Sequence, residues 1–423
     1  MKTTDIFSNI FVIFYSIKTL TELYLNSRNI RHIKTKSGKV PYEFKERVPL
    51  TDHQKAAKYN SVKLGFGQFS LFYHTAILYF WLPFGGVNLL NAEIAKLTPN
   101  TLLQGLIFFS SFFLISTLLS LPERLFSTFV IEEKFGFNKT TGKIFTIDLF
   151  KQLLLAAILG LPLLTGILYV YENAGVYWWV YTWLLMTAFQ FFVIWAYPTF
   201  IAPFFNKFAP LKSDELILKI NALMEKTGFE SNGLFVMDAS TRTSHGNAYF
   251  SGLGKKKRIV FFDTLLKTLT PDEVTAVLAH ELGHFKKKHI IKSLTISLFL
   301  SLVGLGILGY VSQHEWFYSI HFVNTQSSYM ALFLFSLIIP VYTFFFTPFS
   351  SWFSRKNEYE ADDFAAIHTN PKHLIESLVK LYRDNASSLT PDPLYSKFYH
   401  SHPAAIDRIT NLKTKLISHE SVL

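Results

Sequence analysis

Two histidines and a glutamate near the middle of the chain, His280, Glu281 and His284, have the residue types and spacing of a metallopeptidase site. Residues four positions apart on a helix share one face, so the two imidazoles can point at the same spot. Such a pair can hold a zinc ion, and Glu281 is then placed to polarise a water on that metal. Because this short pattern also arises by chance, the rest of the chain must supply a third ligand and a suitable setting.

The third ligand must come from elsewhere in the sequence, because hydrolytic zinc sites use three protein ligands and one open position. The chain has no cysteine, so only His, Asp or Glu can serve. Glu358 and Asp362 are four residues apart in a predicted helix and share a face. We predict Glu358 as the third ligand, and Asp362 as a partner that orients a ligand histidine or handles a proton. The competing interpretation is a solvated acidic face, which the neighbouring Glu360 also fits.

In this scheme Glu281 is the general base, which takes a proton from water as the water attacks a peptide carbonyl. The oxyanion that forms needs a donor besides the metal, and His402 and Arg408 are the two candidates. From the sequence alone, each is more simply a surface or capping residue. His289 follows His284 by five residues, so it projects well away from the ligand face. We interpret His289 as structural or interfacial.

The segment that carries the two histidines has a well-marked helix start. Thr270 is a predicted N-cap, Pro271 is the first helical residue, and Glu273 stands three residues after the cap. These three residues predict that the metal motif lies on a helix.

The catalytic segments are predicted to combine helices and strands. Within 204–289, an amphipathic helix precedes two strands, GLFVMDAS and KKRIVFFDTLL. HGNAYFSGLGKK lies between them as a strand and turn, with Gly252 and Gly254 as breakers. Within 351–423 we predict three helices, the first of which carries Glu358. Each segment is small, so we expect the two to fold together.

The composition is that of a membrane protein. Half of the 423 residues are hydrophobic, only 17% are charged, and 44 are phenylalanine. The net charge of +11 could indicate nucleic-acid binding, but the basic residues lie between apolar segments, where membrane topology explains them. We therefore expect no nucleic-acid partner. Stretches long enough to span a bilayer occur at 5–25, 66–91, 101–121, 146–170, 177–203, 290–312 and 329–350.

The fold class expected from these stretches is mainly α, a multi-pass protein with about seven transmembrane helices. Lysine and arginine are concentrated in alternate connections, which predicts a cytosolic C-terminus and an outward N-terminus. The long basic connection that carries the metal motif is then cytosolic. We expect transmembrane helices one to five in 1–203, the first half of a zinc catalytic domain in 204–289, helices six and seven in 290–350, and its second half in 351–423.

Six stretches in order carry a family resemblance that covers most of the chain. They are VIEEKFGFNKTT, YPTFIAPFFNKFAPL, TSHGNAYFSGLGKKKRIVFFDTLL, HELGHFKKKH, SRKNEYEADDFA and YHSHPAAIDRI. In these stretches the chain resembles the type-I CAAX prenyl protease family of integral-membrane zinc endopeptidases. The resemblance implies one Zn²⁺ held by His280, His284 and Glu358. It also implies that Glu281 is catalytic and that Asp362 is a partner of the site.

The resemblance further implies a water-filled chamber within seven helices, with a small α+β zincin-like catalytic domain at its cytosolic end. Polar residues at or near membrane depth suit a wet interior. They are Gln68, His74, Asp148, Lys151 and Gln190.

A substrate-binding strand is also implied. HGNAYF is expected to lie beside the cleft, where His245 and Asn247 hold the substrate backbone as an added strand. From the sequence alone, Asn247 is more simply a turn residue. Arg408 is counted with these two as a substrate-binding candidate.

The implied activity is endoproteolysis near the C-terminus of prenylated CAAX-type or other membrane-associated proteins, by a monomer in a lipid bilayer. Two alternatives stay open: a broad quality-control protease for membrane proteins, and a zinc-bearing chaperone or transporter without catalysis. The last predicts a closed four-ligand site and leaves Glu281 without a task. The chain ends in SHESVL, with no obvious dilysine-type signal, so a bacterial inner membrane is as well supported as the endoplasmic reticulum.

Overall fold

Helices dominate the computed structural model, which describes residues 3–251 and 256–420, and the side chains of residues 10–250 and 257–417. The predicted breakers Gly252 and Gly254 lie outside the described residues. The helices before the sheet are α1 (Thr3–Lys36), α2 (Leu50–Trp81), α3 (Gly86–Ala95), α4 (Thr101–Phe126), α5 (Glu133–Phe135), α6 (Gly142–Leu155), α7 (Leu161–Asn173), α8 (Trp178–Ala196), α9 (Ala202–Phe205) and α10 (Asp214–Thr227). Those that follow are α11 (Asp263–Thr268), α12 (Pro271–Lys286), α13 (His289–Val311), α14 (Glu315–Ser319), α15 (Ser328–Thr343), α16 (Thr347–His368), α17 (Pro371–Asp384), α18 (Pro393–Tyr399) and α19 (Ala405–Glu420).

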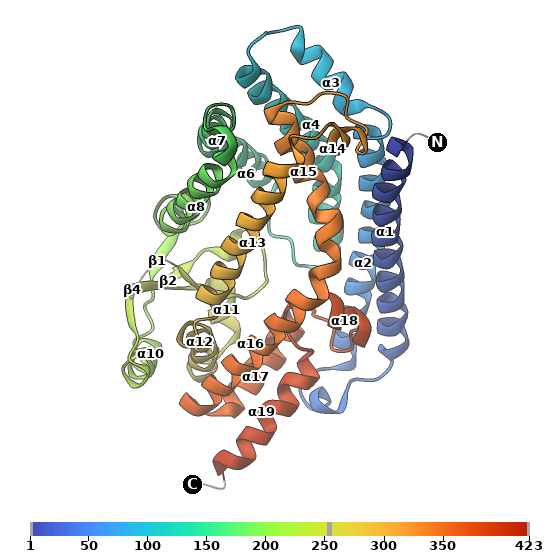
Figure 1. Ribbon diagram of the computed structural model, residues 1–423. Helices are drawn as coiled ribbons and strands as arrows, with labels where there is room; N and C mark the ends of the chain where they lie inside the picture. The colour runs from blue at the N-terminus through green and yellow to red at the C-terminus, as the bar shows by residue number, and fades with distance from the viewer. Residues whose placement is uncertain (1–2, 252–255, 421–423) are drawn as a thin grey trace.

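Five helical segments in the described chain are long and apolar enough to cross a membrane. They are Thr101–Phe135, Gly142–Asn173, Gly175–Phe205, His289–Val311 and Ser328–His368. Four of them contain a predicted span completely, and His289–Val311 contains all but the last residue of 290–312. The multi-pass architecture is therefore confirmed, and five of the predicted spans lie on these helices. In Figure 1 the N-terminus lies toward the α3 and α14 end of this bundle and the C-terminus at the opposite end.

The first two predicted spans lie on α1 and α2, which are 34 and 32 residues long but are not among these five apolar segments. The predicted boundaries of the second, 66–91, are wrong. The helix ends at Trp81, and Gly85 has φ +78 before α3 begins, so the chain turns inside the predicted span. The two helices nevertheless pack together, and Tyr15 Oη donates to Thr75 Oγ1 at 3.0 Å.

A small sheet joins the membrane helices to the catalytic half. Its strands are β1 (Phe208–Pro210), β2 (Glu230–Met237), β3 (Ala248–Ser251) and β4 (Lys256–Phe262), in the order β1-β2-β4-β3. Only β2 and β4 are parallel; β1 and β3 pair antiparallel with their neighbours. The predicted strand KKRIVFFDTLL is too long, because Asp263 begins α11 and accepts from Ser240 N at 2.9 Å. β3 is an edge strand and lies against α12.

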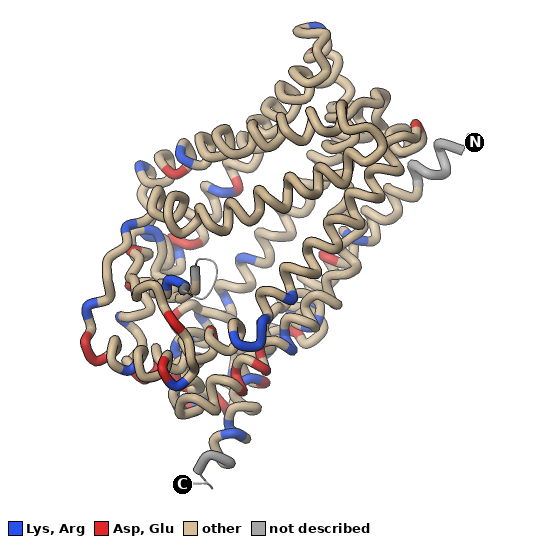
Figure 2. Tube along the Cα trace, turned by 60° about the vertical axis from the view of Figure 1, so that its left-hand side comes forward, with Lys and Arg blue, Asp and Glu red and all other residues tan. Residues whose placement is uncertain are grey.

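One hydrophobic core contains residues of both segments, 204–289 and 351–423. Buried residues of α10, α12 and β4 pack with those of α16, α17 and α19; they include Ile220, Phe261, Leu282, Ala365, Leu374 and Ile409. Figure 1 shows α12, α16, α17 and α19 gathered at the end of the molecule that carries the C-terminus. Charged residues concentrate at this end, whereas the long membrane helices are largely free of them (Figure 2).

Gly283, inside the metal motif, lets α12 and α16 approach closely. A Cβ there would lie 2.9 Å from Ala361 Cα and 3.0 Å from its carbonyl oxygen. Both are backbone atoms that cannot rotate away. Glycine in a helix interior costs roughly 1 kcal/mol relative to alanine, so its presence here is explained by the close packing.

We expect Gly283→Ala to force α12 and α16 apart and to destabilise the catalytic half by about 1–3 kcal/mol, despite the better helix propensity of alanine. Thermal unfolding of the purified protein in detergent measures this. The control is Gly304→Ala on α13, where the nearest atom to the new methyl group is Phe335 Cζ at 3.9 Å. Equal unfolding temperatures for the two variants would contradict this account of Gly283.

Candidate active site

His280, His284 and Glu358 come together from α12 and α16. One ligand atom from each lies within 4.8 Å of the others. The two Nε2 atoms are 3.2 Å apart, and Glu358 Oε1 lies 3.3 Å from His284 Nε2. Among the described residues these three form the one group that could hold a metal ion in this way.

The chemistry of this donor set fits a divalent cation. Two imidazole Nε2 atoms face each other, and two lone pairs at this distance repel unless a proton or cation lies between them. Glu358 Oε2 is buried and accepts no well-formed hydrogen bond from a described residue, although His402 Nδ1 lies 2.7 Å away. Two imidazoles and a carboxylate are ligands that zinc favours. The residues therefore fit a zinc site.

His280 contacts the buried carboxylate of Asp362 through the ring nitrogen that faces away from the site. Its Nδ1 lies 2.8 Å from Asp362 Oδ1, so Nδ1–H can donate there and leave the Nε2 lone pair facing the site. Burial opposes protonation of the ring, but Asp362 and Glu358 outweigh it and raise the pKa of His280 to about 9. A cation at the site competes with that proton, so metal binding and proton release are coupled.

Arg408 donates two hydrogen bonds to Asp362, from Nη2 at 2.6 Å and from Nε at 2.9 Å. Both residues are buried. Burial disfavours the charged guanidinium, but Asp362 outweighs it and raises the pKa of Arg408 further. This geometry favours a positioning role for Arg408 over the predicted contact with substrate, because its donors face Asp362. It likewise favours the orienting role for Asp362 over proton handling.

His284 is supported by two residues that the sequence did not reveal. Its Nδ1 lies 3.0 Å from His289 Nδ1, and His289 Nε2 lies 3.1 Å from Glu360 Oε2. The prediction that His289 points away is wrong because it assumed one continuous helix. Lys288 has φ 58, so α12 ends and α13 begins at a turn that brings His289 back to His284. Glu360 is likewise no free solvated acid.

We expect His289→Ala to weaken metal affinity about 10- to 100-fold, because His284 loses the acceptor that fixes its ring. Glu360→Gln should have a smaller effect, since the amide oxygen can still accept from His289 Nε2–H. Titration with a competing chelator measures both. The control is His373→Ala, a half-exposed histidine outside the site. If His289→Ala binds metal as tightly as the control, His289 does not position His284.

Glu281, the predicted general base, and His402, a predicted oxyanion donor, differ in their surroundings. Glu281 is partly buried on α12, and within the described chain its carboxylate makes no hydrogen bond or ion pair. It is thus available to a water or substrate. His402 is exposed, with Nδ1 beside Glu358 Oε2.

The predicted substrate-binding strand lies beside the motif helix, but its two polar residues differ. His245 stacks on Phe137, with ring centroids 4.5 Å apart, and its Nδ1 lies 3.2 Å from Asn385 Oδ1. Its Nε2 lies 3.6 Å from Glu132 Oε2, so its ring is already engaged. Asn247 is exposed; its Oδ1 accepts from Ala248 N at 2.8 Å, and its backbone carbonyl oxygen accepts from Phe262 N at 2.9 Å.

The polar residues predicted at membrane depth mostly find individual partners. Asp148 accepts from Arg242 Nε and Nη2 at 2.8 and 3.0 Å, and His74 Nε2 lies 2.9 Å from Glu123 Oε2. Lys151 Nζ donates to the Phe204 carbonyl oxygen, and Gln68 Nε2 donates to Ser27 Oγ at 2.7 Å. Gln190 is partly buried on α8.

The fold and the site together define a multi-pass membrane metallopeptidase. A family model described as "CAAX prenyl protease N-terminal, five membrane helices" matches residues 29–207, and the model of Peptidase family M48 matches residues 210–416. The chain belongs to the CAAX prenyl protease 1 family of M48 metallopeptidases.

Curated relatives and a solved structure agree over nearly the whole chain. The CAAX prenyl protease 1 homolog of Dictyostelium discoideum is 33% identical over 431 residues, which is 96% of this chain and 98% of the relative. CAAX prenyl protease 1 of Saccharomyces cerevisiae is 33% identical over 424 residues, which is 92% of this chain and 92% of the relative. The crystal structure of S. mikatae Ste24p matches with a TM-score of 0.89 and 31% identity, over 96% of this chain and 98% of that one.

Proposed function

We propose that the protein is a zinc-dependent endopeptidase that cleaves prenylated CAAX-type proteins near their C-terminus. The observation that supports this most is the cluster of His280, His284 and Glu358 next to Glu281, whose carboxylate has no hydrogen-bond or ion-pair partner among the described residues. One zinc ion held by the three ligands would act as a Lewis acid that polarises the peptide carbonyl and makes water more acidic.

The chain's own residues supply the remaining chemistry. Glu281 removes a proton from the attacking water and delivers it to the nitrogen of the leaving amine. Asp362 and Arg408 keep His280 in the tautomer that faces the site. His402 is the better placed of the two candidate oxyanion donors, because it is exposed whereas Arg408 is buried.

The proposed membrane arrangement has seven spans, with α1 and α2 added to the five apolar segments. Large apolar side chains on both helices are exposed, which suits contact with lipid; they are Ile13, Phe14, Ile17, Leu20, Phe69, Phe72 and Phe80. In the 18-residue apolar stretch of Gly142–Asn173, only 6% of the residues are buried, and the same fraction holds for Gly175–Phe205. A helix in a solid bundle buries one face, so this low fraction supports lipid on one side and a chamber on the other.

We propose that residues 204–289 and 351–423 act as one zincin-like catalytic domain on the cytosolic side, as the alternation of basic connections indicates. The open edge of β3 supports binding of an extended substrate by strand addition, through the backbone rather than through the engaged ring of His245. This orientation applies in a bacterial inner membrane and in the endoplasmic reticulum alike. The proposed unit is the monomer.

The substrate class rests on the named activity of the relatives, and a broad quality-control protease is the main competitor. Purified protein should be incubated with a farnesylated CAAX peptide and with its unprenylated twin, with and without a chelator, and the products mapped by mass. We expect chelator-sensitive release of the last three residues from the farnesylated peptide. Equal cleavage of both peptides at scattered bonds would favour the quality-control function, and no cleavage of any peptide by zinc-loaded protein would favour a non-catalytic role.

A further inference from the structure

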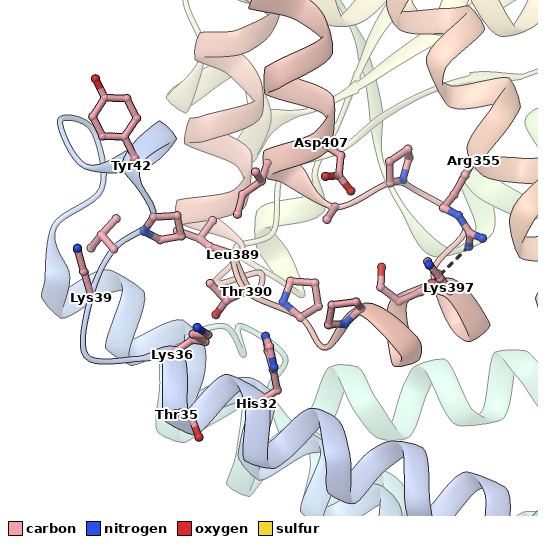
Figure 3. A pocket seen from close by; sticks show the side chains of 18 of the residues that line it. His32, Thr35, Lys36, Lys39, Tyr42, Arg355, Leu389, Thr390, Lys397 and Asp407 are labelled. Carbon is pink, nitrogen blue, oxygen red and sulfur yellow. Dashed lines mark hydrogen bonds between the residues drawn. The ribbon is translucent and has the colours of Figure 1, made fainter.

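A large basic groove lies beside the site, on the face of α16 next to Glu358. It has a volume of about 1260 Å³ and is formed by the end of α1, the loop around η1 (Tyr42–Phe44), the start of α16 and the segment around α18. Figure 3 shows Lys36 and Lys39 along one side and Arg355 with Lys397 at the other. The proposed proteolysis gives no role to any of these residues.

The charges that line the groove are almost all of one sign. Of the residues that the structure describes, five cations line it, Lys36, Lys39, Lys45, Arg355 and Lys397, against one carboxylate, that of Asp407. Among the described residues, none of the four lysines makes an ion pair. Arg355 donates only to backbone carbonyl oxygens, at 2.8 Å to His400 and 3.3 Å to Ser396. Unpaired lysines are common on any surface, but five cations that line one concavity give it the positive charge to attract an anion.

The groove also has an apolar side that continues toward the membrane. Trp352 lines it and is 56% exposed, and its ring lies 6.0 Å from that of Phe349, which is 75% exposed. Phe346, 71% exposed, precedes them at the point where α15 gives way to α16. Exposed aromatic rings at the end of an apolar helix are typical of the membrane interface. The groove thus opens from an aromatic, membrane-facing rim onto a cluster of cations.

We propose that this groove binds the phosphate headgroup of an anionic phospholipid, whose acyl chains lie against Phe349 and Trp352. The complementary charge selects an anion, and the aromatic rim selects an amphiphile over a free ion. The volume is also far larger than inorganic phosphate needs. Lys36 at the end of α1 and the loop residues Lys39 and Lys45 contact the phosphate headgroup from one side of the groove, and Arg355 contacts it from the other.

The test measures binding of short-chain phospholipids to the delipidated full-length protein in detergent. Dioctanoyl phosphatidic acid is the anionic probe, and dioctanoyl phosphatidylcholine and inorganic phosphate are the comparison ligands. The groove variant is Lys36→Gln/Lys39→Gln/Lys45→Gln. The matched control is Lys134→Gln/Lys143→Gln/Lys212→Gln, which removes three exposed lysines elsewhere and lowers the net charge equally.

We expect the groove variant to bind phosphatidic acid at least tenfold more weakly than the wild type, while the control stays within twofold. Phosphatidylcholine should bind weakly to all three proteins, and millimolar inorganic phosphate should not displace phosphatidic acid. An equal loss in both variants would mean general electrostatic attraction and would overturn the proposal. Displacement by inorganic phosphate would overturn it in favour of a free-anion site. Melting temperatures equal to that of the wild type confirm that the variants are folded, and the readout is independent of proteolysis.

Discussion

Glu281→Gln is expected to lower kcat for peptide cleavage about 10²- to 10⁴-fold while leaving the metal content unchanged. The side chain lies between the two ligand histidines in sequence, yet within the described chain it makes no ion pair or hydrogen bond that would hold the fold together. Glutamine keeps the size of the side chain but cannot accept a proton. The loss should therefore fall on the chemical step and not on stability or metal binding.

The measurement is cleavage of a farnesylated CAAX peptide at saturating concentration, with metal content determined on the same preparation. The control is Asp272→Asn, an acidic residue on the same helix that pairs with Lys219 at the surface. We expect the control to retain at least half of the wild-type activity. A Glu281→Gln enzyme with more than a tenth of wild-type kcat would show that another group removes the proton.

The three residues proposed as metal ligands could be selected from the sequence because their geometry is local. His280 and His284 are one helical turn apart, and so are Glu358 and Asp362, so each pair shares a face wherever its helix lies. The sequence therefore identifies the two helix faces, and the packing of α12 on α16 brings these faces together at one site. Gly283 marks that packing inside the motif itself, since only a residue without Cβ permits it.

The supporting residues could not be predicted because they depend on where helices end and on contacts between distant segments. His289 reaches His284 only because Lys288 adopts φ 58, and a lysine gives no local signal for that conformation. Arg408 and His280 are 128 positions apart, and neither has a sequence pattern that indicates the other. A glycine at position 288 would have suggested the helix break.

Errors in the predicted spans have the same origin. Hydropathy alone predicted one continuous span over residues 66–91. In the structure α2 ends before Pro83, and a separate helix, α3, begins after Gly85, which has a positive φ. The turn signal was present in the sequence, but the apolar residues on both sides hid it. α1 and α2 also carry charged residues toward the catalytic end, and neither is among the five apolar segments of the described chain.

The second large effect is expected at Arg408, where Arg408→Leu should lower the free energy of unfolding by about 3–5 kcal/mol. The substitution leaves the fully buried Asp362 carboxylate without the cation that neutralises it. It also removes Nη1, which lies 3.6 Å from Glu358 Oε2. The three elements that carry the site, α12, α16 and α19, meet at this residue.

Thermal unfolding in detergent and chelator titration measure stability and metal affinity separately. The double variant Asp362→Asn/Arg408→Leu should regain most of the lost stability, because it removes the unpaired charge while Asn Oδ1 can still accept from His280 Nδ1–H. The surface control Arg47→Leu, whose partner Glu376 lies 3.7 Å away, should change stability by less than about 1 kcal/mol. If Arg408→Leu unfolds at the wild-type temperature, or if the double variant is no more stable than the single one, then the ion pair is not what holds Asp362 against His280. The site would then depend on helix packing alone.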